Sequence, residues 1–171
     1  MGQDNPRRRP RRPGRATSDG ERRQLARASR RVAAKPAEPA RAYALLLCDG
    51  GSRGNPGPAA AAAVLVAPGG TVVARRALAI GRATAAEAEY RAILVGLELA
   101  AAHGADPVEI RSDSQLAIAA VVHQRPGDVV LARLVDDIRL RSRAFSAVRW
   151  TWHPRADNEL PDAMVRELLW A

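Results

Sequence analysis

The sequence predicts an α/β domain built on a mixed five-stranded sheet, with a separate basic segment in front of it. Two extended apolar runs flank Pro68-Gly69-Gly70, which is typical of an antiparallel hairpin. Later in the chain, short strand-like runs alternate with segments of helical periodicity, a pattern that favours parallel pairing. Apolar residues make up 47% of the 171 residues, which is enough for the core of a single domain at 42–171.

The N-terminal segment, residues 1–41, differs in composition from the rest. It holds 13 Arg and Lys residues against 4 Asp and Glu, whereas residues 42–171 hold 14 of each, so the whole net charge of +9 lies in this segment. Its Arg/Pro-rich run at 7–15 cannot bury an apolar face, and we expect it to be disordered. Residues 21–34 have good helix formers, and 35–39 resemble a linker. Two interpretations stay open: an electrostatic arm for nucleic acid, or a solvated tail without a specific role.

The first half of the domain is expected to contain three strands and one long helix. Apolar runs predict strands at 42–49, 59–67 and 71–80. Thr84 is a suitable N-cap for the helix that follows, and Gly104 is a suitable stop. Between them, apolar residues recur at helical spacing: Tyr90, Ile93, Leu94, Leu97 and Ala101.

The second half is expected to alternate strands with helices. Short strands are predicted at 107–112 and 148–152, and helices at 114–123, 130–144 and about 161–170. In the helix at 130–144, most of the apolar positions should share one inner face; they are Leu131, Leu134, Ile138 and Leu140. Pro161 is expected at the first helical position, where a missing N–H is tolerated. The predicted order is therefore β-β-β-α-β-α-α-β-α.

Four acidic residues stand at the ends of these predicted elements. Asp49 ends the first strand and opens the glycine-rich run at 50–57, and Asp113 follows the fourth strand. If these strands are parallel neighbours, both carboxylates emerge at one edge of the sheet. Glu89 lies early in the first helix and Asp162 begins the last one. Four converging carboxylates would hold two hard divalent cations, as phosphodiester chemistry requires, and would repel one another without them.

The motifs around these acids resemble those of the type 1 ribonuclease H family. The matching segments are Asp49-Gly50-Gly51-Ser52-Arg53-Gly54-Asn55-Pro56-Gly57, Thr84 with Ala88-Glu89-Tyr90-Arg91-Ala92 and Gly96-Leu97, Ser112-Asp113-Ser114, and Arg155 with Asn158 and Asp162. The resemblance covers residues 42–168, and four motifs in the same order are highly specific. It implies the RNase H-like fold, a five-stranded mixed sheet with helices on both faces.

The resemblance also implies an activity. Family members cut the RNA strand of RNA–DNA hybrids, leaving 3′-hydroxyl and 5′-phosphate ends, with two Mg²⁺ ions that Mn²⁺ can replace. Asp49, Glu89, Asp113 and Asp162 would be the catalytic metal ligands, with Asp49 shared by both ions and Glu89 also touching a ribose 2′-hydroxyl. The residues implied in substrate binding are Gly50, Gly51, Ser52, Arg53, Gly54, Asn55, Ser114, Arg155 and Asn158.

Some positions leave alternatives open. Glu87 is a rival to Glu89, but residues two apart on a helix point to different faces, and the Ala-Glu-Tyr motif favours Glu89. His153 resembles a helper of product release, although a histidine that simply ends a strand is slightly favoured. Ala85 and Ala86 replace an asparagine pair that usually reaches the hybrid, and a basic protrusion of some members is missing, so the N-terminal segment could supply the additional contact.

Two other functions stay open as well. The chain could bind nucleic acid without cutting it, or it could be a related nuclease with another nucleic-acid substrate. Retention of all four acids speaks against the first, because a site without activity need not keep them. The lone cysteine, Cys48, rules out an internal disulfide, and no Cys/His cluster suggests zinc. No apolar run is long enough to span a membrane and no signal peptide is evident, so we expect a cytoplasmic protein, and a monomer.

Overall fold

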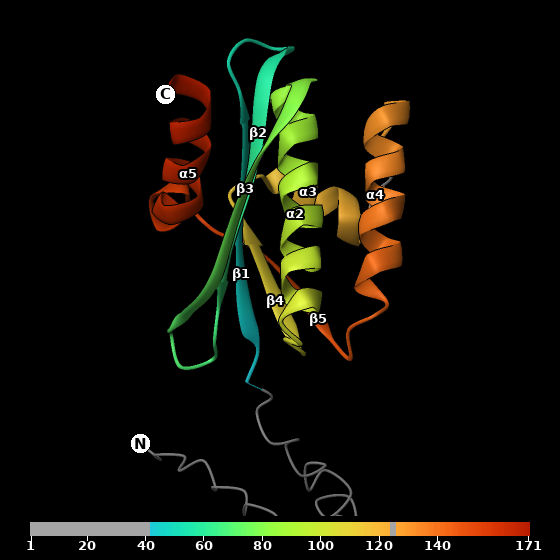
Figure 1. Cartoon of the computed structure of the whole chain (residues 1–171). Coiled ribbons are helices and arrows are strands. Elements are labelled where there is room, and N and C mark those ends of the chain that lie inside the picture. The colour runs from blue at the N-terminus through green and yellow to red at the C-terminus, as the bar shows by residue number, and fades with distance from the viewer. Residues whose placement is uncertain (1–41, 124–125) are drawn as a thin grey trace, which may run out of the picture. The chain divides into compact units, whose positions relative to one another are not determined.

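The computed structural model of the chain describes residues 42–123 and 126–171, and Figure 1 shows a single sheet flanked by helices. The expectations for residues 1–41 lie outside this described part. The elements are β1 (Ala44–Ser52), β2 (Gly57–Val66), β3 (Val72–Ala83), α2 (Ala85–Ala102), β4 (Val108–Ser112), α3 (Gln115–Val122), α4 (Val129–Ser142), β5 (Val148–Trp152), the short 3₁₀ helix η1 (Arg155–Asp157) and α5 (Glu159–Trp170). The predicted order of strands and α-helices is confirmed.

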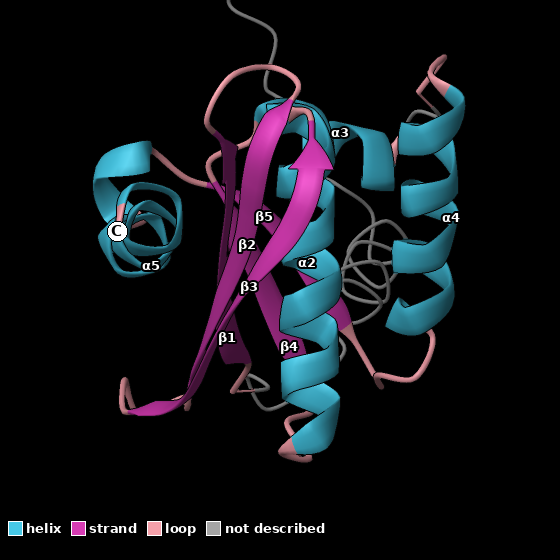
Figure 2. Cartoon of the chain, turned by 45° about the horizontal axis from the view of Figure 1, so that its top comes forward, coloured by secondary structure: helices cyan, strands magenta, loops and turns pink. Residues whose placement is uncertain are grey.

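The sheet is mixed, as predicted. Its strand order is β3-β2-β1-β4-β5. The β1–β2 and β2–β3 pairs are antiparallel, whereas β1–β4 and β4–β5 are parallel. Helix α2 lies against one face, with α3 and α4 on the same side, and α5 lies alone on the other (Figure 2). Because β1 occupies the centre of the sheet, its residues are covered from both sides.

Most of the core lies between the sheet and α2. Leu46, Ile93, Leu97 and Ile110 are completely or almost completely buried there, and Ile138 of α4 joins them. Full burial of such a side chain contributes about 1.5–3 kcal/mol to folding. A second, smaller cluster joins α5 to the outer face of β2 through small alanine side chains; its buried members are Ala60, Ala62, Val165 and Leu169.

The first strand is longer than the sequence predicts. β1 continues past Asp49 to Ser52, because its pairing with β2 runs on through Gly50–Ala61 to Ser52–Ala59. The glycines were expected to form a turn from residue 50, yet Gly50 and Gly51 belong to β1 and Gly57 is the first residue of β2. β3 likewise extends beyond residue 80 to Ala83, which pairs with the first residue of β2. Asp49 therefore lies inside a strand rather than at its end.

The prediction that most apolar positions of α4 share an inner face holds, whereas one helix start is corrected. Leu140 is the exposed member of the set, because it follows the buried Ile138 by two residues, or about 200° around the helix. Helix α5 begins at Glu159, so Pro161 is its third residue and not its first. The missing N–H of Pro161 is still harmless there, since first-turn N–H groups have no partner within the helix. No helix in the described part of the chain is long and apolar enough to cross a membrane.

Candidate metal centre

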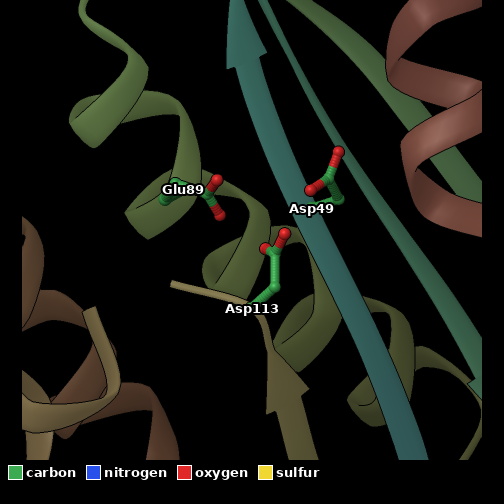
Figure 3. Close-up of side chains that lie close together, drawn as sticks. All are labelled: Asp49, Glu89 and Asp113. Atoms are coloured by element: carbon green, nitrogen blue, oxygen red, sulfur yellow. The ribbon is translucent and has the colours of Figure 1, made fainter. Parts of the chain in front are cut away.

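Three of the four predicted acids meet at one edge of the sheet. Asp49 of β1, Glu89 of α2 and Asp113 after β4 each place a carboxylate oxygen within 4.8 Å of the others. Figure 3 shows the three side chains pointing toward one another. Two of them meet because β1 and β4 are parallel and pair at Cys48–Ser112, so the next residue of each chain segment is an aspartate. The predicted neighbourhood of Asp49 and Asp113 follows directly from this register.

The third acid reaches the site because α2 packs unusually close to β1. A Cβ atom on Gly50 would lie 2.1 Å from the carbonyl carbon of Ala88 and 2.4 Å from the backbone nitrogen of Glu89. Only glycine permits this approach. The resemblance implied that Gly50 and Gly51 serve substrate, but the structure gives both a packing reason. A Cβ on Gly51 would lie 3.1 Å from Val165 Cγ1.

The N-terminus of α2 explains the choice between the two glutamates. Thr84 is the N-cap, as predicted: its Oγ1 accepts from the Glu87 backbone N at 3.1 Å, and Glu87 Oε2 accepts from the Thr84 backbone N at 2.7 Å. This reciprocal capping box occupies Glu87 at the helix end. Glu89 is free to face Asp49.

The ionisation of the acids reflects their crowding. Burial, together with the charges of Asp113 and Asp162, raises the pKa of Asp49 to about 7. Burial, with the charges of Asp49 and Asp113, raises the pKa of Glu89 to about 9. Two buried oxygens, Glu89 Oε2 and Asp113 Oδ1, have no hydrogen-bond partner among the described residues. Crowded, unpartnered carboxylate oxygens are the donor set that a hard divalent cation prefers, so the residues present fit such an ion.

Another buried acid shows the contrast. Glu109 of β4 accepts hydrogen bonds from Arg111 at 2.9 Å, Thr151 at 3.0 Å and Arg149 at 3.2 Å. Burial raises the pKa of its carboxyl, but these hydrogen bonds and charges outweigh burial and bring the pKa below its ordinary value. Glu109 is therefore a structural ion-pair group, because its carboxylate has partners for both oxygens. Glu89 lacks such a set of partners.

The fourth acid lies beside the cluster but is held by arginines. Asp162, in the first turn of α5, accepts from Arg155 Nη2 at 2.5 Å through one oxygen and from Arg166 Nη2 at 2.9 Å through the other. Its charge still acts on Asp49. The hydrogen bond and the charge of Asp162 raise the pKa of Arg155. Arg166 was not singled out from the sequence, although its position four residues after Asp162 is the signal that could have found it.

The predicted substrate residues have varied surroundings. Arg53 and Gly54 are exposed in the turn after β1, and Ser52 is half-buried. Asn55 Oδ1 accepts from the Ala85 backbone N at 3.0 Å, which links this turn to the start of α2. Ser114 caps α3 by accepting from the Ala117 N.

Two further predicted residues lie inside the protein. The ring of His153 is buried, and its Nε2 has no partner in the described part of the chain. Asn158 is completely buried, and its Nδ2 donates to the Cys48 carbonyl at 2.9 Å. Solvent does not reach its side chain in this structure, so the contact of Asn158 with substrate stays a prediction that the geometry does not support.

Comparison with known proteins agrees with this fold. A protein-family model described as reverse transcriptase-like matches residues 47–168. A ribonuclease HI of Halobacterium salinarum is 44% identical over 126 residues, covering 71% of this chain and 61% of that protein. A bifunctional protein of Mycobacterium tuberculosis is 38% identical over 127 residues, covering 71% of this chain and 34% of that protein. The chain thus covers less than two thirds of these relatives.

Solved structures show the same architecture. The crystal structure of RNase H1 from Halobacterium salinarum superimposes with a TM-score of 0.72 at 41% identity, covering 73% of this chain and 96% of that one. LC11-RNase H1, solved in complex with an RNA/DNA hybrid, gives a TM-score of 0.69 at 28% identity and covers 72% and 94%. The fold and the acidic cluster define an RNase H-like protein. The chain belongs to the reverse transcriptase-like family, in its ribonuclease HI-like branch.

Proposed function

We propose that this chain is a ribonuclease H that hydrolyses the RNA strand of RNA–DNA hybrids with two Mg²⁺ ions, leaving 3′-hydroxyl and 5′-phosphate ends. The observation that carries the proposal is the convergence of Asp49, Glu89 and Asp113 within 4.8 Å, with unpartnered buried oxygens between them. Support also comes from the relatives: the halobacterial protein is named a ribonuclease HI, and LC11-RNase H1 was solved with a hybrid.

Each side chain has a distinct task in this proposal. Asp49, Glu89 and Asp113 would hold divalent cations, and Asp162, whose charge acts on Asp49, would complete the set. When bound, such ions activate water and stabilise the leaving oxygen of a phosphodiester. Arg155 and Arg166 each donate to one oxygen of Asp162 and so hold its carboxylate in place. The exposed turn at 53–55, which Asn55 links to the start of α2, would contact the nucleic-acid backbone.

A substrate panel tests the proposal. Labelled RNA–DNA hybrid, double-stranded RNA, single-stranded RNA and a DNA junction are incubated with the intact chain and Mg²⁺ or Mn²⁺. We expect cleavage of the hybrid alone, within its RNA strand. Preferred cleavage of another member of the panel would indicate a related nuclease, and tight binding of hybrid without any product would indicate a non-catalytic binder.

Divalent cations should stabilise the protein in a pH-dependent way. Asp49 and Glu89 have raised pKa values in the metal-free fold, so their ionised forms are disfavoured, and the stability of that fold should fall as the pH rises from about 4 to about 9. A cation needs the ionised forms and offsets this loss. We therefore expect Mg²⁺ to raise the melting temperature more at about pH 8.5 than at about pH 6. Thermal unfolding with Mg²⁺ or with EDTA measures this shift in melting temperature. Equal shifts at both pH values would contradict the assignment of Asp49 and Glu89 as metal ligands.

Removing residues 1–41 should weaken binding of nucleic acid. This segment carries 13 basic residues against 4 acidic ones, whereas the rest of the chain has no net charge. Each phosphate neutralised adds about 0.9 to the slope of log affinity against log salt concentration. The truncated chain should therefore bind hybrid more weakly, with a flatter salt dependence, and keep its turnover at saturating substrate. Binding titrations across a salt series give the slope, and an unchanged slope would show that the segment makes no such contact.

A further inference from the structure

Asn158 occupies an unusual position for an asparagine. It lies between η1 and α5, it is completely buried, and its side-chain amide donates to the Cys48 carbonyl at 2.9 Å, across 110 residues of sequence. Cys48 directly precedes Asp49 in β1. The backbone carbonyl of Asn158 also accepts from the Asp162 N at 3.2 Å. One residue is thus bonded to the neighbour of one site acid and to the backbone of another.

The Cys48 carbonyl lies where the pairing of β1 with β4 ends. Pairing of β1 with β4 runs as far as Cys48–Ser112, where the chain turns into α3. Just beyond this pair, the Ser114 backbone N donates to Ser112 Oγ. A buried carbonyl without a partner is costly, by about 1–3 kcal/mol. The Asn158 amide donates to this carbonyl and so ties the last residue of β1 that pairs with β4 to the start of α5.

The other half of the amide argues for a positional role. Asn158 Oδ1 is buried and has no partner among the described residues. An apolar side chain of similar volume would fill this space without that penalty. The donor function of Nδ2 is therefore the property that distinguishes asparagine here.

We infer that Asn158 is a positioning residue, which fixes Asp49 relative to Asp162 so that the acids can bind divalent cations. It does this through Cys48 on one side and through the first turn of α5 on the other, without touching substrate. The inference rests on the proposed function. The inference goes beyond the proposed function, because it assigns control over metal affinity to a buried residue outside the acidic cluster.

The test compares metal binding and kinetics in the intact chain. Calorimetric titration with Mn²⁺ should show about tenfold weaker binding for Asn158→Ala, which is the lower end of the effect of residues that orient metal ligands. The turnover number for hybrid cleavage should fall, while KM for the hybrid changes less than about twofold, because no substrate contact is lost. Asn158→Leu keeps the branched side-chain skeleton and removes the donor. It should show the same loss, and it decides between the outcomes if the alanine variant does not fold.

A remote core variant controls for simple loss of stability. Val135→Ala removes buried volume from α4, away from the site, and should leave Mn²⁺ affinity unchanged. The inference is overturned if Asn158→Leu binds Mn²⁺ as tightly as the wild type, or if KM rises while turnover stays constant. Failure of the proposed function looks different: the wild-type chain would bind Mn²⁺ yet cut no hybrid, and the comparison of affinities would still stand.

Discussion

Replacing Asp49 by asparagine is expected to abolish cleavage of the hybrid while making the metal-free protein more stable. Asp49 lies in the three-acid cluster, and loss of its charge should remove at least about a thousandfold in rate, or about 4 kcal/mol. The same charge is unfavourable in the metal-free fold, because burial and Asp113 raise the pKa of Asp49 from 3.8 to about 7. Each pKa unit corresponds to about 1.4 kcal/mol, so a gain on the order of 1–3 kcal/mol in unfolding free energy is expected near pH 8.

Single-turnover rates with Mg²⁺ and urea unfolding in EDTA measure the two effects separately. Asp137→Asn is a matched control, since Asp137 is exposed on α4 and is not part of the acidic cluster. It should change neither the rate nor the unfolding free energy. If Asp49→Asn were less stable than the wild type in EDTA, the ionised Asp49 carboxylate would not be destabilising the metal-free fold, which contradicts this account.

Gly50→Ala should damage both stability and activity. The added Cβ would lie 2.1 Å from the Ala88 carbonyl carbon, and backbone atoms cannot yield as a flexible side chain would. Helix α2 must therefore move away from β1, at a cost of roughly 1–3 kcal/mol in unfolding free energy. Because Glu89 moves with α2, we expect about a hundredfold loss of turnover, the size expected for a displacement of about 1 Å at a catalytic group.

The matched control is Gly69→Ala, in the turn between β2 and β3. A Cβ atom there would meet nothing within 4 Å. This variant should keep wild-type turnover and stability in the same assays. Wild-type turnover in Gly50→Ala would mean that the close approach of α2 to β1 does not position Glu89.

The meeting of Asp49 with Asp113 could be predicted from sequence, because both follow apolar runs that pair in parallel. Helix geometry showed that Glu87 and Glu89 cannot both face the site, and the Ala-Glu-Tyr motif selected Glu89. The true end of β1 could not be predicted: Gly50 and Gly51 suggest a turn locally, whereas pairing with β2 continues through both. Gly50 and Gly51 are glycines because α2 and α5 pack against them, and no local sequence pattern indicates this packing.

Residues that act over long separations were the hardest to assign. Asn158 was grouped with the substrate contacts because it belongs to a motif, but its partner is 110 residues away and is a backbone carbonyl. No pattern of side chains in the sequence indicates such a bond. Of the two arginines that contact Asp162, one could have been predicted. Arg166 follows Asp162 at helical spacing, whereas Arg155 lies in η1, outside the helix.

The most direct test of the central claim is cleavage of an end-labelled RNA–DNA hybrid by the intact wild-type chain, with the product ends identified. The proposal predicts cuts in the RNA strand that require Mg²⁺ or Mn²⁺, stop in EDTA, and leave 3′-hydroxyl and 5′-phosphate ends. A folded protein that gives no product with either ion, or one that cuts equally well in EDTA, would contradict the assignment of a metal-dependent ribonuclease H.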